Sequence, residues 1–105
     1  MSIYITLVRG QLKHADTLAE NQAAHDAINI PLQALGKRHS AIGHRAYLNA
    51  NDPKEFLGLD TWTTIDGPQQ LFSDPRLAEE FGKLFEGMPE ITFWKASGWG
   101  SFADV

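Results

Sequence analysis

The middle of the chain decides the fold. Residues 42–49 read IGHRAYLN and residues 55–64 read EFLGLDTWTT, two runs rich in aliphatic, aromatic and β-branched side chains. Between them lies Asn51-Asp52-Pro53, which has the turn chemistry to join two antiparallel strands. The sequence therefore predicts a β-hairpin at the centre of the chain.

A helix and a strand are expected on each side of this hairpin. On the N-terminal side, residues 2–8 form a short β-rich segment that leads into a long helical stretch. On the C-terminal side, a second amphipathic helix precedes a closing strand at residues 90–96. The order β-α-β-β-α-β within 105 residues is typical of the ferredoxin-like split βαβ unit. The predicted fold class is therefore α+β, a four-stranded antiparallel sheet with helices on one face.

Capping and breaking residues set the expected ends of the helices. Asp16 is a candidate N-cap for the first helix. Pro31 predicts a kink or a break in that helix, because proline removes one backbone donor and clashes with the preceding turn. Asp74 and Pro75 supply the N-cap and the first position of the last helix. The apolar stripe expected on that helix is Leu77, Phe81, Leu84, Phe85 and Met88.

Composition narrows the classes of function. One domain is expected over residues 1–105, with a Gly-rich tail at 97–105. The chain has no cysteine, which leaves no disulfide framework and no thiolate chemistry. Its net charge of −4, with one basic cluster at residues 37–39, argues against nucleic acid as a partner. Without a signal-peptide pattern or an apolar run of membrane length, we expect a soluble cytoplasmic protein that does not bind membranes.

The two faces of the sheet are predicted to differ in kind. The set expected under the helices is aliphatic: Ile3, Ile5, Leu7, Ile42, Leu48, Leu57 and Leu59. The set expected on the opposite face is mostly aromatic: Tyr4, Val8, Tyr47, Phe56, Trp62 and Trp94. Monomers rarely leave so large an apolar patch in water, so we expect a homodimer packed sheet to sheet about a twofold axis. The alternative is a lone domain with a loop or the tail folded over that face.

Five short segments carry a resemblance to a known family. They are IYITLV at residues 3–8, LDTWT at 59–63, DG at 66–67, SDPRLA at 73–78 and ITFW at 91–94. In these segments the chain resembles the dimeric α+β barrel superfamily, and more narrowly its antibiotic-biosynthesis-monooxygenase type and uncharacterised relatives. The resemblance spans nearly the whole chain, at structural positions more than at catalytic ones.

The resemblance implies a homodimer with a pocket between the sheet and the helices of each subunit. Some relatives oxidise polyphenolic, quinol-like substrates with dioxygen and no cofactor, others cleave haem, and many have no assigned activity. Haem-degrading relatives use an Asn on the first strand together with a Trp and a His in the second helical region. Here residues 2–8 contain no Asn and residues 75–87 contain no His, which argues against haem degradation.

Two histidines are the leading candidates for chemistry. His25 shares the apolar stripe of the first helix, and His44 lies on the strand face assigned to the helices, so we expect the two imidazoles to meet in one pocket. A neutral imidazole in an apolar pocket can act as general base toward a phenol or an acidic C–H group. The alternative for each is a core histidine held by a backbone carbonyl. Two histidines without a placed carboxylate fall short of a closed metal site, so neither a metal nor a cofactor is predicted.

Further residues have either a structural or a ligand-binding role. Asp60 is expected on the dimer face, paired with Arg45 across the hairpin, and is interpreted with Tyr4 as part of the interface. The candidates for stacking on a flat aromatic ligand, or for anchoring the interface, are Trp62, Trp94 and Tyr47. Asp26 is expected to be a solvated helix carboxylate.

Two functions remain open from the sequence. The first is a cofactor-independent monooxygenase that acts on a small aromatic or quinol-like molecule, with His25 and His44 as base and partner. The second is a non-catalytic protein that binds a small apolar ligand or serves as a dimer scaffold. Convergence of the two imidazoles within hydrogen-bond reach in an open pocket favours the enzyme, and burial of each against a backbone carbonyl favours the second.

Overall fold

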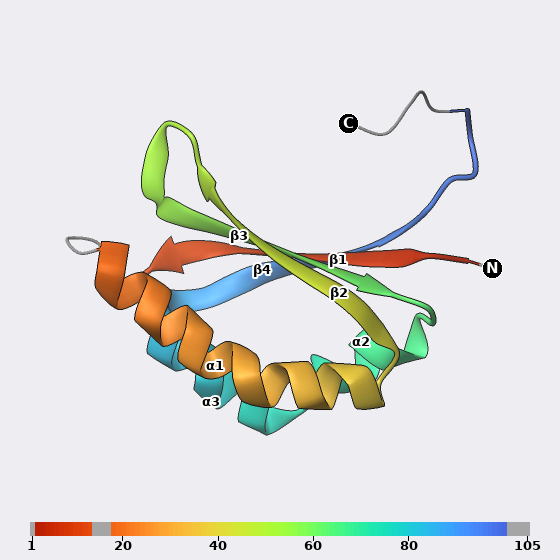
Figure 1. Cartoon of the computed structure of the whole chain (residues 1–105), viewed down its shortest axis with the longest axis horizontal. Helices are drawn as coiled ribbons and strands as arrows, with labels where there is room; N and C mark the ends of the chain where they lie inside the picture. Colours follow the sequence, from red (N-terminus) through yellow and green to blue (C-terminus); the bar gives the residue numbers. More distant parts are fainter. Residues whose placement is uncertain (1, 14–17, 101–105) are drawn as a thin grey trace.

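Four antiparallel strands form one sheet, and helices cover one of its faces (Figure 1). The structure is a computed structural model that describes residues 2–13 and 18–100. Its elements are β1 (Tyr4–Leu12), α1 (Leu18–Arg38), β2 (Ala41–Asn49), β3 (Asp52–Trp62), α2 (Asp66–Leu71), α3 (Pro75–Leu84) and β4 (Phe85–Lys95). The strand order is β2-β3-β1-β4. The predicted ferredoxin-like arrangement is therefore confirmed.

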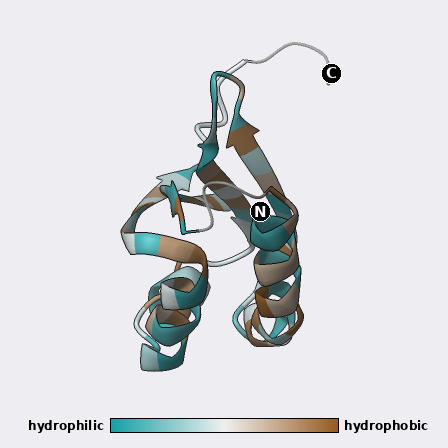
Figure 2. Ribbon diagram, turned by 90° about the vertical axis from the view of Figure 1, so that its left-hand side faces the viewer, coloured by the Kyte–Doolittle hydropathy of each residue, from teal (hydrophilic) through white to brown (hydrophobic). Residues whose placement is uncertain are grey.

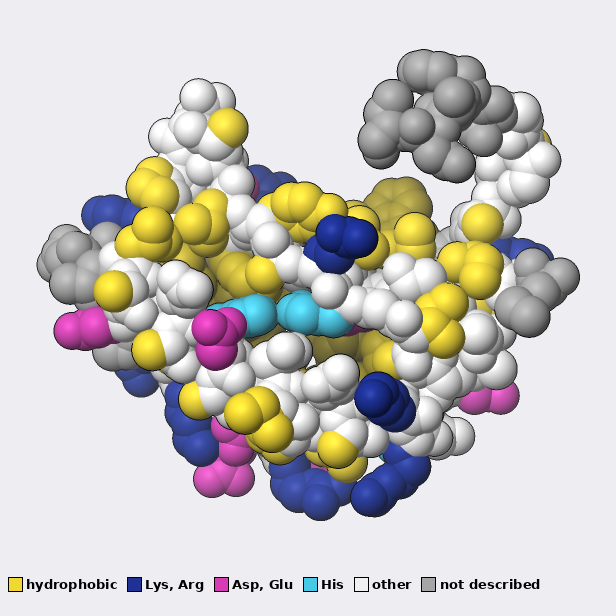
Figure 3. All heavy atoms as spheres, viewed as in Figure 1, with side chains coloured by type: hydrophobic (Ala, Val, Ile, Leu, Met, Phe, Trp, Pro, Cys, Tyr) yellow, Lys and Arg dark blue, Asp and Glu magenta, His cyan; other side chains and the backbone are white. Residues whose placement is uncertain are grey.

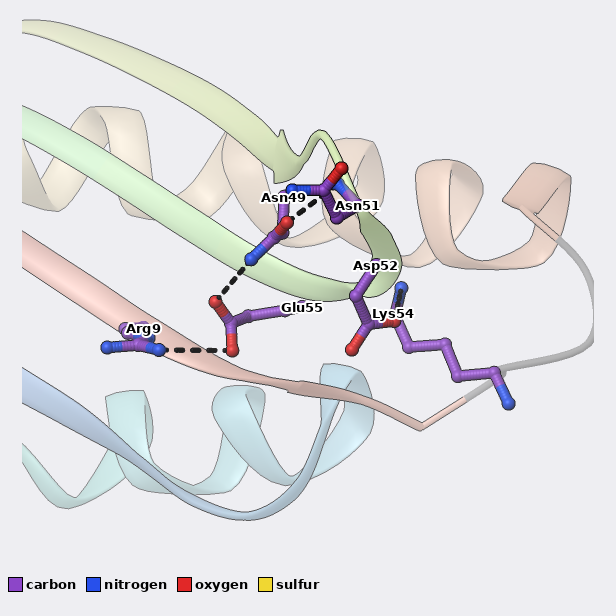
Figure 4. A network of polar contacts seen from close by, with 6 residues as sticks. All are labelled: Arg9, Asn49, Asn51, Asp52, Lys54 and Glu55. Atoms are coloured by element: carbon purple, nitrogen blue, oxygen red, sulfur yellow. Dashed lines mark hydrogen bonds and ion pairs between the residues drawn. The ribbon is translucent and has the colours of Figure 1, made fainter.

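A polar network fixes the end of the β2–β3 hairpin (Figure 4). The side chain of Asn49 accepts from the amide of Asn51 at 2.8 Å and donates to Glu55 at 3.0 Å. Arg9 of β1 donates to the other oxygen of Glu55 at 3.2 Å. The bonds from Asn49 and then Arg9 lower the pKa of Glu55 below its usual value. The network links the tip of the hairpin to the neighbouring strand and supports one register of the sheet.

The helix ends follow the predicted signals in part. Asp74 caps α3 by accepting from the amide of Arg76 at 2.9 Å, and its bonds to Arg76 lower the pKa of this carboxyl to about 2. Helix α1 runs unbroken through Pro31, so the expected break is wrong. Pro31 is exposed, while Ile28 before it and Gly36 after it are buried, and this packing holds both halves in one helix. Asp16 lies outside the described residues.

Helix α3 ends earlier than expected, and β4 begins earlier. The backbone of Phe85 is extended, and its ring lies in the core, 5.5 Å from the ring of Phe56 and 5.6 Å from that of Phe81. Gly10 makes room for it, because a Cβ there would lie 2.7 Å from Phe85 Cδ1. Met88 therefore belongs to a strand, is 73% exposed, and is not part of the helical stripe.

The helices cover the opposite face of β1 and β3 from the one predicted. The buried residues on these strands include Thr6, Val8, Phe56 and Trp62, and alternation places Ile5, Leu7, Leu57 and Leu59 away from the helices. Helical residues that complete the core are Ile28, Leu71, Leu77, Phe81 and Leu84. Both faces of β1 are apolar, so alternation alone did not decide which face is covered. Figure 2 shows the helices on one side of the sheet, with hydrophobic segments in the strands as well as in the helices.

A close backbone approach makes Gly67 the most constrained glycine. It begins α2 beside the turn that follows α1, and a Cβ there would lie 1.6 Å from the carbonyl oxygen of His39. Gly82 of α3 has open space where its Cβ would lie.

We expect Gly67→Ala to lower the free energy of unfolding by about 3 kcal/mol through overpacking. Gly82→Ala should raise it by roughly 1 kcal/mol through helix propensity. Urea denaturation of both variants measures this, and equal stabilities would contradict the close approach.

Candidate functional site

A pocket of about 430 Å³ lies between the sheet and the helices. Its wall is mostly apolar and includes Val8, Phe56, Trp62, Leu71 and Phe81. The polar side chains that reach the same wall are His25, Asn29, Gln33, Lys37, His44 and Asp60. An apolar cavity of this size with a few polar groups at one side is typical of a small-molecule site.

Two histidines meet at this pocket, one from each layer. Helix α1 places His25 on the stripe that also carries Ile28 and Leu32, and strand β2 places His44 on the face that the helices cover. Their Nε2 atoms are 3.1 Å apart, which is hydrogen-bond distance. The expected convergence of the two imidazoles is confirmed. Figure 3 shows two histidine side chains next to each other in a hollow of the surface, between the sheet and α1.

The two rings meet end to end. Their centres are 5.3 Å apart, the Nε2 atoms 3.1 Å, and the ring planes differ by 19°. The two nitrogens therefore lie on the line between the ring centres, with both rings close to one plane. Since the lone pair of an imidazole nitrogen lies in the ring plane, this geometry suits an N–H···N hydrogen bond. The ring of Phe56, 5.5 Å from that of His25, forms an apolar wall beside the pair.

Each imidazole has a carboxylate on its other nitrogen. Asp60 Oδ1 lies 2.6 Å from His44 Nδ1, and Asp26 Oδ1 lies 3.1 Å from His25 Nδ1. The two carboxylates differ in environment: the side chain of Asp60 is 18% exposed and that of Asp26 is 63% exposed. A carboxylate on the second nitrogen orients an imidazole and selects its tautomer. The histidine pair is thus held from both ends, and more firmly at the inner end.

The contacts continue from Asp60 into the core. Thr6 Oγ1 donates to Asp60 Oδ2 at 3.3 Å and accepts from Trp62 Nε1 at 3.0 Å. Thr6 and Trp62 are both buried, and among the described residues no buried side-chain N or O atom is left without a partner. The polar contacts therefore form one chain from an exposed carboxylate on α1 to the indole under the helices. Its members in order are Asp26, His25, His44, Asp60, Thr6 and Trp62.

The structure corrects the predicted place of three residues. Asp60 lies on the helix face beside His44, and not with Arg45, which pairs with Leu59 in the register of the sheet and alternates to the other face. Trp62 lines the pocket from the helix face, and Tyr4 packs against the core cluster. All three were assigned to the dimer face because the covered face of β1 and β3 was chosen wrongly.

The remaining predicted residues lie outside the main pocket. Trp94 is 56% exposed on the face of the sheet away from the helices, where its Nε1 donates to Thr92. Tyr47 lines a second pocket of about 190 Å³, which shares His25 and Phe56 with the first. Trp99 in the Gly-rich tail is 85% exposed, and residues 101–105 lie outside the described residues.

Sequence reasoning missed Thr6 and the link between Asp60 and His44. Thr6 and Asp60 are register partners on adjacent strands, and so are Asp60 and His44. Three polar residues aligned across three strands are the signal that could have found the site. Within residues 2–13 and 18–100, no group of three His, Asp or Glu side chains is placed to hold a metal ion. In the same part of the chain, no helix is long and apolar enough to cross a membrane.

Solved structures with the same fold are numerous, with 41 matching chains. No family model matches the chain, and no curated protein matches its sequence. SnoaB from Streptomyces nogalater, a cofactor-independent oxygenase, superposes with a TM-score of 0.65 at 11% identity and covers 99% of this chain and 100% of its own. The chain has an antibiotic-biosynthesis-monooxygenase-like fold.

Two further neighbours share this monooxygenase-like fold. A Bordetella bronchiseptica protein, provisionally assigned as an antibiotic biosynthesis monooxygenase, has a TM-score of 0.71 at 13% identity over 90% of this chain and 96% of its own. A protein of unknown function from Nitrosomonas europaea has a TM-score of 0.64 at 18% identity over 99% and 98%. At these identities the likeness shows the fold, and the chemistry has to be argued from the site.

The bond between Thr6 and Trp62 supports the inner end of the site. Thr6→Val keeps the shape of the side chain but leaves the buried indole N–H without an acceptor, so we expect the free energy of unfolding to fall by about 2 kcal/mol. Thr61→Val is the matched control, because Thr61 is less buried and lies on the other face of β3. Urea denaturation should show a change below about 0.5 kcal/mol for the control. Equal losses in both variants would contradict a special role for the Thr6 hydroxyl.

Proposed function

We propose that this protein is a cofactor-independent monooxygenase that oxidises a small aromatic, quinol-like molecule in the pocket between sheet and helices. The observation that carries the proposal is the His25–His44 pair, which meets at hydrogen-bond distance on the wall of a largely apolar pocket. The monooxygenase-like fold, shared with a cofactor-independent oxygenase, supports the reaction class. Trp62 and Phe56 supply flat apolar walls against which an aromatic ring can pack.

The reaction needs a base more than any other group. An imidazole takes a proton from a phenolic O–H or an acidic C–H of the substrate, and leaves an electron-rich anion. The anion passes one electron to dioxygen, and the two radicals combine into a C–O bond. The resulting peroxide anion takes the proton back. Loss of water from the hydroperoxide then leaves a quinone that carries one oxygen atom of dioxygen, while the other leaves in the water.

The apolar wall favours this chemistry in two ways. It excludes water from the side of the pocket where the ring of the substrate lies, which strengthens the electrostatic contact between the new anion and the protonated imidazole. The wall also selects a substrate with little charge elsewhere, since a second ionised group would be desolvated without a partner. Apart from the two histidines, Lys37 is the one basic side chain on the wall that the structure describes.

We also propose that two copies pack through the open faces of their sheets. That face carries the half-buried aliphatic residues of β1 and β3 together with the more exposed Tyr47 and Trp94. A second copy would cover this patch from water, as the fold of the neighbours suggests. The pocket lies on the other side of the sheet, so dimerisation would leave it open to substrate.

Oxygen uptake tests the enzyme. With a panel of dihydroxynaphthalenes and anthrones, the wild-type protein should consume dioxygen without added metal or flavin. His25→Ala and His44→Ala should each reduce turnover by about 100-fold, because general-base catalysis contributes on this scale. His39→Gln is the control, since His39 lies at the end of α1, outside the pocket wall, and should keep full activity. Binding of the panel without oxygen uptake would favour a ligand-binding protein instead.

Light scattering tests the dimer. Trp94→Glu places a charge on the open face, and should shift the protein from dimer to monomer at micromolar concentration. Ile30→Glu is the matched control, because Ile30 is a similarly exposed apolar residue on α1 and lies away from the sheet. A wild-type monomer, or a Trp94→Glu variant that stays as dimeric as the control, would rule out packing through the sheets.

A further inference from the structure

We propose that His25 and His44 work as one base that stores a single proton between their Nε2 atoms, and that Asp60 is the positioning residue that sets this state. The proposal deepens the proposed oxygenase function, on which its chemical use rests. Its geometry belongs to the free protein and can be tested without a substrate. Its basis is the chain of contacts that runs from Asp26 through both rings to Asp60.

A count of protons defines the proposed state of the pair. Three contacts link the four side chains: Asp26 to His25, His25 to His44, and His44 to Asp60. Each contact is a hydrogen bond only if one proton lies within it. With both carboxylates ionised, one proton sits on each Nδ1 and the third lies between the Nε2 atoms. The pair then carries one positive charge and the four groups together carry one negative charge.

The pair becomes a base on the pocket wall once the shared proton has passed to solvent. Both rings then keep their Nδ1 protons toward the carboxylates, so two Nε2 lone pairs face each other at 3.1 Å in nearly one plane. That arrangement is repulsive, and a proton placed between the two nitrogens turns the repulsion into a hydrogen bond. A substrate hydroxyl at the pocket wall can supply it: its O–H bond breaks, an N–H bond forms, and the phenolate remains beside a cationic pair.

Asp60 controls this state more than Asp26 does. Its bond to His44 is the shorter of the two, 2.6 Å against 3.1 Å, and its side chain is the less exposed. Its second oxygen accepts from Thr6, whose hydroxyl is itself held by Trp62, so the carboxylate has little freedom to rotate. Asp60 therefore holds the Nδ1–H tautomer of His44 and keeps Nε2 free for the shared proton.

Asp26 is the carboxylate at the solvent-exposed end of the histidine pair. It follows His25 directly in α1, and its side chain is 63% exposed. A proton on the pair can therefore pass to solvent through His25, the ring that contacts this carboxylate, while Asp60 stays under the helices. This arrangement lets the base recover after turnovers in which the proton is not returned to the product. Among the described residues that line the pocket, Lys37 is the one ionisable side chain besides the two histidines and Asp60.

The substrate class follows from the shape of this acceptor. The accepting atoms are the two Nε2 nitrogens at the wall, and the surrounding wall is mostly apolar. A planar phenol with one acidic hydroxyl at its edge can reach one of these nitrogens while its ring lies against Phe56 or Trp62.

The test is long-range ¹H–¹⁵N NMR of the histidine rings at pH 7, in the free wild-type protein. We expect both Nδ1 atoms to have the ¹⁵N shifts of a protonated imidazole nitrogen. Both Nε2 atoms should have ¹⁵N shifts between those of a protonated and a bare nitrogen, and one low-field proton resonance should be coupled to both of them. A spectrum in which His44 carries its proton on Nε2 with a bare Nδ1 would overturn the proposal. So would two rings that each titrate with no shared resonance at any pH between 5 and 9.

Two matched variants separate the roles of the carboxylates. Asp60→Asn should abolish the low-field resonance and convert His44 to the Nε2–H tautomer, whereas Asp26→Asn should keep both features of the wild type. With an active substrate, Asp60→Asn should lower kcat by about 100-fold and leave KM within about threefold, as expected for loss of an oriented base. Unchanged tautomers in Asp60→Asn would overturn the role of Asp60. If the wild-type spectrum is as expected while the protein consumes no oxygen with any substrate of the panel, the shared proton between His25 and His44 is confirmed and the oxygenase function is wrong.

Discussion

The packing of Trp62 under the helices is the constraint on which the rest of this structure depends. Its side chain is 1% exposed, so the indole N–H needs an acceptor within the protein, and Thr6 on the adjacent strand provides it. That bond fixes which face of β1 and β3 is covered. It also brings Asp60, the register partner of Thr6, onto the covered face, where His44 is the neighbour on the other side. The catalytic candidates are therefore a consequence of how one aromatic side chain is buried.

The element order was predictable because several independent signals agree. The turn signal at residues 51–53, the cap at Asp74 and the alternation in the strands all favour the same β-α-β-β-α-β order, although the turn itself lies at residues 50–51 and β3 already begins at Asp52. The unbroken course of α1 through Pro31 was not predictable, because the packing on both sides of a proline is a tertiary property. The early end of α3 depends likewise on room for the ring of Phe85, which a glycine on a distant strand provides.

The candidate site was predictable only in its histidines. His25 was found from helical periodicity, and His44 from alternation in β2, whose covered face was assigned correctly. Asp60 was assigned to the wrong face together with Trp62, because the covered face of β3 was chosen wrongly. The missing information was the register between strands, which decides that Thr6, Asp60 and His44 share one row. Periodicity within one strand contains no such information.

The alignment of Thr6, Asp60 and His44 also helps to decide whether these residues have a structural or a functional role. The side chains of His44 and Asp60 are partly exposed, at 34% and 18%, and an ion pair in such a place contributes little to stability. Yet both are placed at the wall of a pocket that is otherwise lined mostly by apolar side chains, and each has its polar atoms satisfied. A core histidine held by a backbone carbonyl was the alternative, and the contacts of both rings are to side chains instead. An arrangement that contributes little to stability but orients two nitrogens toward one point is better explained by what binds there. Proton transfer is the chemistry for which two converging imidazole nitrogens, each backed by a carboxylate, are best suited.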